Sequence, residues 1–339
     1  MESIFNLKYD DLVDYFLSIG EKKFKADQVF RWIYEKRVYD FSQMTNISKE
    51  LQEKLSEHFD ISMLTLRTKQ ESKDTNKYLF ELADGNTIEA VLMKHDYGNS
   101  VCVSSQVGCN MGCSFCESGR LKKVRDLEAS EIVRQILMID DESDTRVSSV
   151  VVMGIGEPFD NYNNVMNFIR IINDDRGIKI GARHITVSTS GLVPMIDKYG
   201  DENIQTNLAI SLHAPNNELR SKLMKVNKAY SIEQVIDAIK RYIDKTNRRV
   251  TIEYLLLDHV NDTNECAIEL SELLRGLNVY VNLIPYNETS HIEYKKSSNE
   301  RVMNFYDILK KHGINVTVRR RFGSEIDAAC GQLRAKEVN

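Results

Sequence analysis

The sequence predicts an incomplete (β/α)6 barrel with a small helical domain and a β-hairpin before it. Three observations favour this fold. Apolar residues recur at helical spacing before residue 72, two strand-like segments then flank a turn, and candidate strands alternate with amphipathic helices from about residue 99. We place the domain boundaries at 1–72, 73–98, 99–325 and 326–339. A doubly wound parallel sheet is the alternative fold.

The first two regions are short. Helical spacing marks residues 10–17, 26–34 and 48–55, and a Ser opens the last of these segments. The hairpin strands are predicted at 77–82 and 87–93, on either side of Asp84-Gly85, which is a favoured hairpin turn.

The third region repeats strand and helix. Helical stretches lie at 129–138, 232–242 and 267–274. Candidate strands begin near Val101, Ser149, His184, Asn207, Val250 and Val279. Because such repeats build parallel βαβ units, ligands should bind at the carboxyl ends of the strands.

Composition excludes several classes of protein. The 339 residues have a formal net charge of −5 and an apolar fraction of 42%, which is typical of globular proteins rather than disordered chains. No apolar run is long enough to span a bilayer, and the first residues do not resemble a secretory signal. We expect a soluble cytoplasmic protein without a membrane partner.

The strongest chemical signal is a group of cysteines. Cys109, Cys113 and Cys116 follow the first barrel strand with the spacing C-x3-C-x2-C. Three thiolates can hold three corners of a [4Fe-4S] cluster and leave one iron open to another ligand. Zinc is the alternative, as in a zinc-stabilised RNA-binding module, but structural zinc needs four ligands and no His lies nearby. Cys266 matches no motif, and we interpret it as structural.

This spacing after the first strand of a barrel resembles the radical S-adenosylmethionine (SAM) superfamily. Further motifs narrow the resemblance to the RlmN/Cfr family of RNA adenine methyltransferases, and the segment 24–33 also resembles that family's helical domain. These motifs occur in order along the chain: Cys102-Val-Ser-Ser-Gln-Val-Gly-Cys109, Gly154-Ile-Gly-Glu-Pro158, Ser188-Thr-Ser-Gly191, Ser211-Leu-His-Ala-Pro215, Asn282-Leu-Ile-Pro-Tyr-Asn287 and Asp327-Ala-Ala-Cys-Gly-Gln-Leu333.

The resemblance implies a cofactor site. It contains one [4Fe-4S] cluster and SAM, of which two molecules are used per turnover. Gly156 and Glu157 would contact the amino end of SAM. The other positions that match SAM-binding residues of the family are Ser188, Ser211, Leu212, His213 and Asn287.

The resemblance also implies three catalytic residues. Cys330 would carry a methyl group as S-methylcysteine, from which a radical generated at a second SAM removes a hydrogen. The carbon radical then adds to the adenine ring, which explains how a carbon that is not nucleophilic becomes methylated. Glu89 would accept the ring proton, and Cys102 would resolve the protein–RNA adduct by forming a disulfide with Cys330.

The implied reaction is methylation of carbon 2 of an adenine in the peptidyl-transferase region of 23S rRNA. The adenine beside the anticodon of some tRNAs is a second expected substrate. Methylation of carbon 8, as in Cfr-type resistance enzymes, is the alternative, although Pro158 and Ala214 favour carbon 2. A radical enzyme that acts on a protein or small molecule is a further alternative, and it would not need Cys330. We also expect a flavodoxin- or ferredoxin-type electron donor and a monomer.

Two details complete the prediction. Basic residues that could contact RNA phosphates lie in the helical domain, after the cysteine motif and before the Cys330 segment. They are Lys22, Lys23, Lys25 and Arg31, then Arg120, Lys122, Lys123 and Arg125, then Arg319, Arg320 and Arg321. Glu117 departs from the family pattern, because it puts a carboxylate beside an anionic cluster; it would either face solvent or alter the reduction potential.

Overall fold

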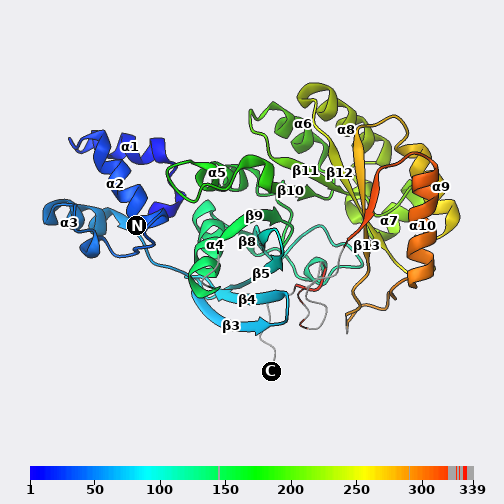
Figure 1. Ribbon diagram of the computed structural model, residues 1–339, viewed down its shortest axis with the longest axis horizontal. Coiled ribbons are helices and arrows are strands. Elements are labelled where there is room, and N and C mark those ends of the chain that lie inside the picture. Colours follow the sequence, from blue (N-terminus) through cyan, green and yellow to red (C-terminus); the bar gives the residue numbers. More distant parts are fainter. Residues whose placement is uncertain (144–145, 290, 320–325, 327, 329–330, 334–339) are drawn as a thin grey trace.

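The computed structural model describes residues 1–143, 146–289, 291–319, 326, 328 and 331–333 (Figure 1). Its centre is a ten-stranded sheet with the strand order β14-β13-β12-β11-β10-β9-β6-β5-β4-β3. The strands from β6 to β14 pair in parallel and follow one another in chain order. A doubly wound sheet reverses its strand order at a switch point. This order therefore confirms the partial barrel and excludes the alternative fold.

The predicted barrel strands all form. They are β6 (Gly98–Val103), β9 (Val147–Val152), β10 (Ile185–Thr189), β11 (Asn207–Ser211), β12 (Val250–Leu256) and β13 (Val279–Pro285). Their valines and isoleucines are mostly buried, as expected of parallel strands that are covered on both faces.

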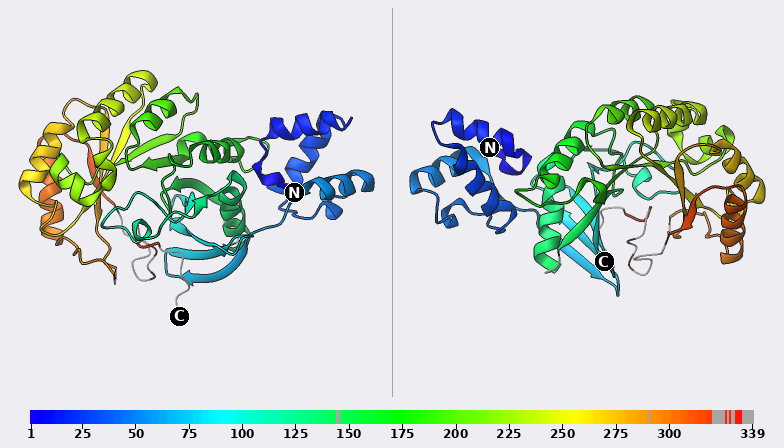
Figure 2. Two further views of the ribbon diagram at one scale, coloured as in Figure 1. Left: turned by 180° about the vertical axis from the view of Figure 1, so that it is seen from behind. Right: turned by 45° about the horizontal axis from the view of Figure 1, so that its top comes forward.

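Helices cover the outer, convex face of the curved sheet (Figure 2). Helix α8 shows how the sequence sets their ends: Ser231 and Gln234 form a capping box, and Asn247 ends the helix with a φ of +53°. None of the described helices is both long and apolar enough to cross a membrane. The barrel helices are α4 (Ala129–Ser143), α5 (Tyr162–Asn173), α6 (Val193–Asp201), α7 (Asn217–Leu223), α8 (Ile232–Thr246), α9 (Asn264–Leu273) and α10 (Asn299–Lys311).

Antiparallel strands extend the barrel sheet at the β6 edge. The predicted hairpin is confirmed as β4 (Thr75–Glu81) and β5 (Thr87–His95), and β5 pairs with β6. A third strand, β3 (Thr65–Glu71), and the short barrel strand β14 (Val316–Val318) were not predicted. The first is a polar, half-exposed edge strand, and the second has only three residues, so neither carries a clear apolar alternation.

The N-terminal helices form a separate lobe beside α4 and α5 (Figure 1). Asn6 joins the lobe to both helices, because its side chain accepts a hydrogen bond from the Ser130 backbone and its carbonyl accepts one from Asn167. The lobe contains α1 (Tyr9–Ser18), α2 (Lys23–Tyr34) and α3 (Lys49–His58), with β1 (Glu2–Ser3) paired to β2 (Phe59–Asp60).

Candidate functional site

The site begins at Ser104, directly after β6. Ser104 is fully buried, and all its polar groups are used. Its backbone exchanges hydrogen bonds with the amide of Gln135 on α4, and its hydroxyl donates to the Glu89 carbonyl on β5 and accepts from the Ile155 backbone. One residue thus fixes the relative positions of β5, β6, α4 and the turn after β9.

The turn Gly154–Pro158 packs against the residues that follow Ser104. Gln106 accepts a hydrogen bond from the Glu157 backbone at 2.9 Å. Gly156 has a φ of +110°, and a Cβ built there would lie 2.6 Å from the Cβ of Gln106. Glycine is therefore required here for two reasons: a side chain would clash with Gln106, and the backbone has a positive φ.

A small strand pair frames the cysteine loop. After β6 the chain forms β7 (Gln106–Val107), which pairs with β8 (Arg125–Asp126). The three thiols of the loop between them, Cys109, Cys113 and Cys116, line a single cavity. Burial raises the pKa of Cys109 to about 12 and that of Cys113 well above its usual value. Such thiols become thiolates when iron binds them.

A buried cation beneath this loop fits an anionic cluster. Arg220 is fully buried and donates hydrogen bonds to the Ser190 carbonyl at 2.6 Å and to Asn227 at 3.0 Å, among other uncharged oxygens. Burial lowers its pKa to about 10, and the nearby Cys113 opposes that change. In the described part of the chain, no three His, Cys, Asp or Glu side chains lie close enough together to hold a single metal ion. A cubane instead takes each thiolate at a different corner.

The same cavity brings together most of the predicted SAM-binding residues, all at carboxyl ends of strands. Its lining includes Gly156, Glu157, Ser188, Ser211 and His213. Leu212 and Asn287 are not among the described lining residues; Leu212 is fully buried and donates its backbone N–H to the Glu253 carbonyl.

Glu157 is held rigidly in this cavity. Its two carboxylate oxygens accept hydrogen bonds from the backbone N–H groups of Phe159 at 3.0 Å and Ser190 at 2.7 Å. Burial raises the pKa of Glu157, and these hydrogen bonds oppose the rise. A carboxylate in this position can receive the ammonium group of a ligand.

His213 is a neutral group in this cavity. Its φ is +58°, and its Nδ1 accepts a hydrogen bond from the Leu255 backbone, so the ring proton sits on Nε2. Burial, and then the charge of Arg220, lower the pKa of His213 to about 3. The imidazole can therefore donate one hydrogen bond to a ligand without carrying charge.

Sequence reasoning missed two charged residues here. Glu253 lines the cavity and accepts a hydrogen bond from Asn282 at 2.8 Å, and burial raises its pKa. Its signal in the sequence is a single carboxylate inside the apolar strand 250–256. Arg220 carries no such signal, because exposed charges flank it on the same short helix.

Two of the three predicted catalytic residues, Glu89 and Cys102, lie on one sheet face beside this cavity. Glu89 is buried on β5, and Cys102 is half-buried on β6 opposite Val91. Cys330 lies outside the described residues. On either side of it, Ala328 and Leu333 pack against Val91, Met93 and Ile155, the apolar cluster that Cys102 also contacts.

Glu117 does not face solvent, because only 5% of it is exposed. Its carboxylate lies 3.4 Å from Nδ1 of His291, and its backbone N–H donates to the Gly331 carbonyl. It therefore helps to hold the C-terminal segment against the cysteine loop. Cys266 lies on α9 and packs against the main core, in keeping with a structural role.

Comparison with known proteins identifies the chain. Residues 3–61 match the family model of the ribosomal RNA large subunit methyltransferase N-terminal domain, and residues 103–272 match the radical SAM superfamily. The probable dual-specificity RNA methyltransferase RlmN of Enterococcus faecalis is 59% identical, over 99% of this chain and 97% of its own length. The corresponding protein of Listeria monocytogenes is 56% identical, over 99% and 94%. The chain belongs to the RlmN family of radical SAM RNA methyltransferases.

A solved structure supports the family assignment. A radical SAM methyltransferase from Sphaerobacter thermophilus has a TM-score of 0.95 and 42% identity, covering 99% of this chain and all of that one. The hydrogenase maturase HydG of Carboxydothermus hydrogenoformans, at 15% identity and a TM-score of 0.50, shares the fold alone. As an RlmN-family enzyme, the chain uses a [4Fe-4S] cluster and SAM and acts on RNA. The zinc-stabilised binding module is therefore rejected.

We predict that Gly156→Ala destabilises the protein by about 2–4 kcal/mol, because the new Cβ combines an unfavourable φ with a clash against Gln106. Gly85→Ala is the matched control: its φ is +81°, but no atom lies within 4 Å of the added Cβ. It should cost about 1 kcal/mol. Urea unfolding of both variants measures the difference, and equal losses would contradict the clash.

His213 makes stability depend on pH. Its pKa is about 3 in the folded protein and 6.5 when unperturbed, so the unfolded chain takes up a proton first as the pH falls. We expect its contribution to stability to be complete above pH 6.5 and to decrease by about 2 kcal/mol between pH 7 and pH 5. The variant His213→Asn, which tolerates the positive φ, should lack this decrease in urea unfolding at the two pH values. Identical pH dependences in the two proteins would refute it.

Proposed function

We propose that this enzyme methylates carbon 2 of one adenine in the peptidyl-transferase region of 23S rRNA and, in some tRNAs, the adenine next to the anticodon. The curated relatives are named dual-specificity RNA methyltransferases RlmN, which supports carbon 2 over Cfr-type methylation of carbon 8. The observation that carries the proposal is the packing of residues on both sides of Cys330 against the face of Cys102, beside the cysteine-lined cavity.

When bound, the cluster and SAM supply a methyl group and a carbon radical. The three loop thiolates, Cys109, Cys113 and Cys116, hold the cluster, and Glu157, Ser188, Ser211 and His213 orient SAM. Cys330 accepts the methyl group as a thioether and presents it to the target adenine. Gly331 supports this assignment, because it follows Cys330 in the chain and lines the cavity.

Two residues complete the transfer. Addition of the methylene radical leaves an unpaired electron on the adenine, which the cluster oxidised during radical formation would accept. Glu89 then accepts the ring proton. The Cys102 thiolate then attacks the Cys330 sulfur: an S–S bond forms, the S–CH2 bond breaks and the released carbon gains a proton to become the methyl group. The position of Cys102 supports this role, since it shares an apolar cluster with Ala328 and Leu333, which flank Cys330.

Lys77 supports the base. Its ammonium lies 3.3 Å from the Glu89 carboxylate, and the two side chains are only 7% and 1% exposed. A buried carboxylate is costly unless a positive charge lies beside it. We assign Lys77 as a positioning residue that balances the charge of the Glu89 carboxylate and holds it in place.

The N-terminal lobe is the part that would contact RNA away from the site. The Phe24 ring is 48% exposed, and the Lys25 ammonium lies 5.3 Å from its centre. Lys22 and Lys23, also exposed, precede it. An exposed ring among cations suits an unpaired base and its phosphates. The target adenine must leave its stack, which favours loops as substrates.

The first test is the identity of the product. Anaerobic enzyme with a reconstituted cluster, SAM and a reductant is incubated with a 23S rRNA fragment or tRNA, and the digested nucleosides are separated by mass spectrometry. We expect 2-methyladenosine from the enzyme and none from the variant Cys330→Ala, which retains the cluster. Production of 8-methyladenosine, or continued turnover without Cys330, would contradict the proposal.

Lys77→Met should slow proton removal and cause the protein–RNA adduct to accumulate at least tenfold, as Glu89→Gln should, because the buried carboxylate loses this countercharge. Lys77→Arg should restore release. The control is Lys69→Met on β3, whose ammonium is 2.7 Å from the exposed Glu71. Denaturing gels of radiolabelled RNA quantify the adduct. If Glu89→Gln accumulates adduct and Lys77→Met does not, the role of Lys77 is wrong.

A further inference from the structure

The cysteine loop has a second, outer side. There it borders an open hollow of about 960 Å³. Cys109 and Cys113 line this hollow as well as the SAM cavity, so the loop itself separates the two. The outer hollow is lined by Cys109, Asn110, Gly112, Cys113, Ser114, Gly119, Arg120, Leu121, Lys122, Lys225, His291, Ile292, Glu293 and Tyr294. Only the cysteine loop would separate a molecule bound in the hollow from the cluster.

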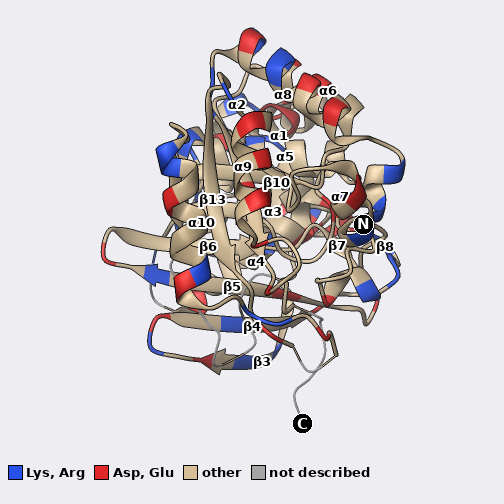
Figure 3. Cartoon of the chain, turned by 90° about the vertical axis from the view of Figure 1, so that its right-hand side faces the viewer, with Lys and Arg blue, Asp and Glu red and all other residues tan. Residues whose placement is uncertain are grey.

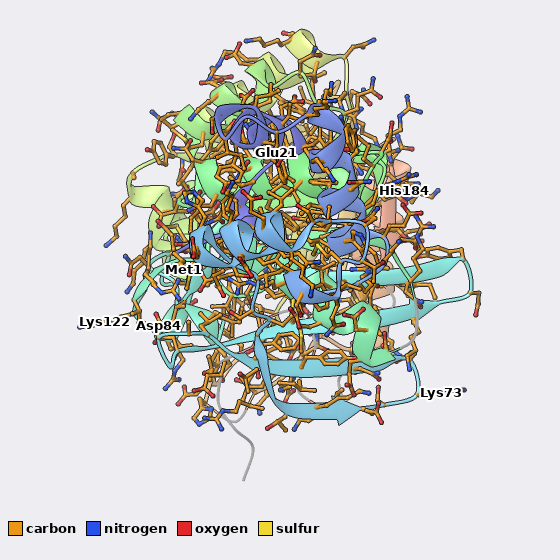
Figure 4. All side chains as sticks on the ribbon, turned by 90° about the vertical axis from the view of Figure 1, so that its left-hand side faces the viewer. Met1, Glu21, Lys73, Asp84, Lys122 and His184 are labelled. Carbon is orange, nitrogen blue, oxygen red and sulfur yellow. The ribbon has the colours of Figure 1, made fainter. Side chains whose placement is uncertain are left out.

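Among the described residues, three cations from two segments line this hollow: Arg120 and Lys122 from the cysteine loop, and Lys225. Lys225 follows α7 yet reaches the loop, since its ammonium is 3.2 Å from a Cβ built on Gly112. Figure 3 shows basic segments beside the α7 and β8 labels, and Figure 4 places Lys122 at the edge of the molecule. Glu293 is the one carboxylate among the lining residues that the structure describes.

These cations differ in their ion pairing from Lys123 and Arg125, the basic residues that follow Lys122 in the sequence. Lys123 pairs with Asp126 and Asp160, and Arg125 pairs with Asp84 and Glu131. Among the described residues, Arg120, Lys122 and Lys225 take part in no ion pair, and Arg120 donates a hydrogen bond to the uncharged His291 carbonyl. The positive charge at the hollow is therefore available to a partner, whereas that of Lys123 and Arg125 is largely neutralised.

We propose that the outer hollow is the docking site of an acidic one-electron donor protein of the flavodoxin or ferredoxin class. The inference rests on the proposed function, which requires an electron for each radical formed. The reduced cofactor of the donor loses one electron and the cluster gains it; no covalent bond forms or breaks. Complementary charge speeds such short-lived encounters, whose interfaces are small.

The position of the hollow favours a donor over RNA. The target adenine must reach the face that carries Glu89 and Cys102, and neither residue lines the hollow. An electron instead needs only proximity to the cluster ligands, and Cys109 and Cys113 provide it there. Donor and substrate would thus approach the cluster from opposite sides of one loop.

The test reverses charge at the hollow with the double variant Lys122→Glu/Lys225→Glu. Its control is Arg275→Glu/Lys311→Glu, which changes the same net charge at exposed positions after α9 and at the end of α10. The probe is reduced bacterial flavodoxin, mixed anaerobically with cluster-loaded enzyme. Stopped-flow absorbance follows cluster reduction, calorimetry measures the flavodoxin Kd, and SAM cleavage without RNA is measured with dithionite as the reductant.

We expect the hollow variant to be reduced by flavodoxin at least tenfold more slowly at low salt and to bind it at least tenfold more weakly. Added salt should slow the unmodified enzyme and the control more than this variant. Dithionite-driven SAM cleavage should change less than twofold, because neither Lys122 nor Lys225 is among the described residues that line the SAM cavity. Unchanged reduction by flavodoxin would overturn the docking site, and a loss of RNA affinity alone would assign the hollow to RNA. Failure of the unmodified enzyme to methylate RNA, despite normal reduction, would instead reject the proposed function.

Discussion

The arrangement of the site depends on the need to satisfy the buried backbone where β6 ends. Ser104 and Gln106 are both fully buried, and the chain must turn there without water to complete its hydrogen bonds. Gln135 on α4, the turn after β9 and the Glu89 backbone supply the partners. The same hydrogen bonds that allow the turn therefore set the start of the cysteine loop, the position of Glu157 and the strand that carries Glu89.

This constraint also separates different kinds of chemistry. The inner side of the cysteine loop faces polar groups at strand ends, whereas Cys102 lies in an apolar cluster on the adjacent sheet face. In the proposed reaction Cys102 acts late, and this shelter would protect its thiol, because exposed thiolates oxidise readily. The buried Lys77–Glu89 pair follows the same logic, since a charge in low dielectric is retained only beside a partner.

Most of the fold could be predicted because parallel strands buried on both faces appear as short runs of branched apolar residues. Val150–Val152 and Leu208–Ile210 are such runs, and both form barrel strands. Strand β3 escaped prediction because pairing with β4, rather than burial, holds its polar residues in the sheet. Hydrogen bonding to the next strand leaves no mark on the apolar periodicity of the segment itself.

How much of the proposed site the sequence can indicate depends on how local each signal is. The thiols of Cys109, Cys113 and Cys116 share one short loop, so their spacing alone indicates a cluster. Arg220 and Lys77 are notable because they are buried. The sequence alone does not show whether an arginine or lysine is buried or exposed to solvent. Lys222, two residues after Arg220, pairs with Glu218 on the surface while Arg220 has no exposed area. Only the tertiary structure distinguishes the two, as it also does for Lys77, whose ammonium lies beside the buried Glu89 carboxylate.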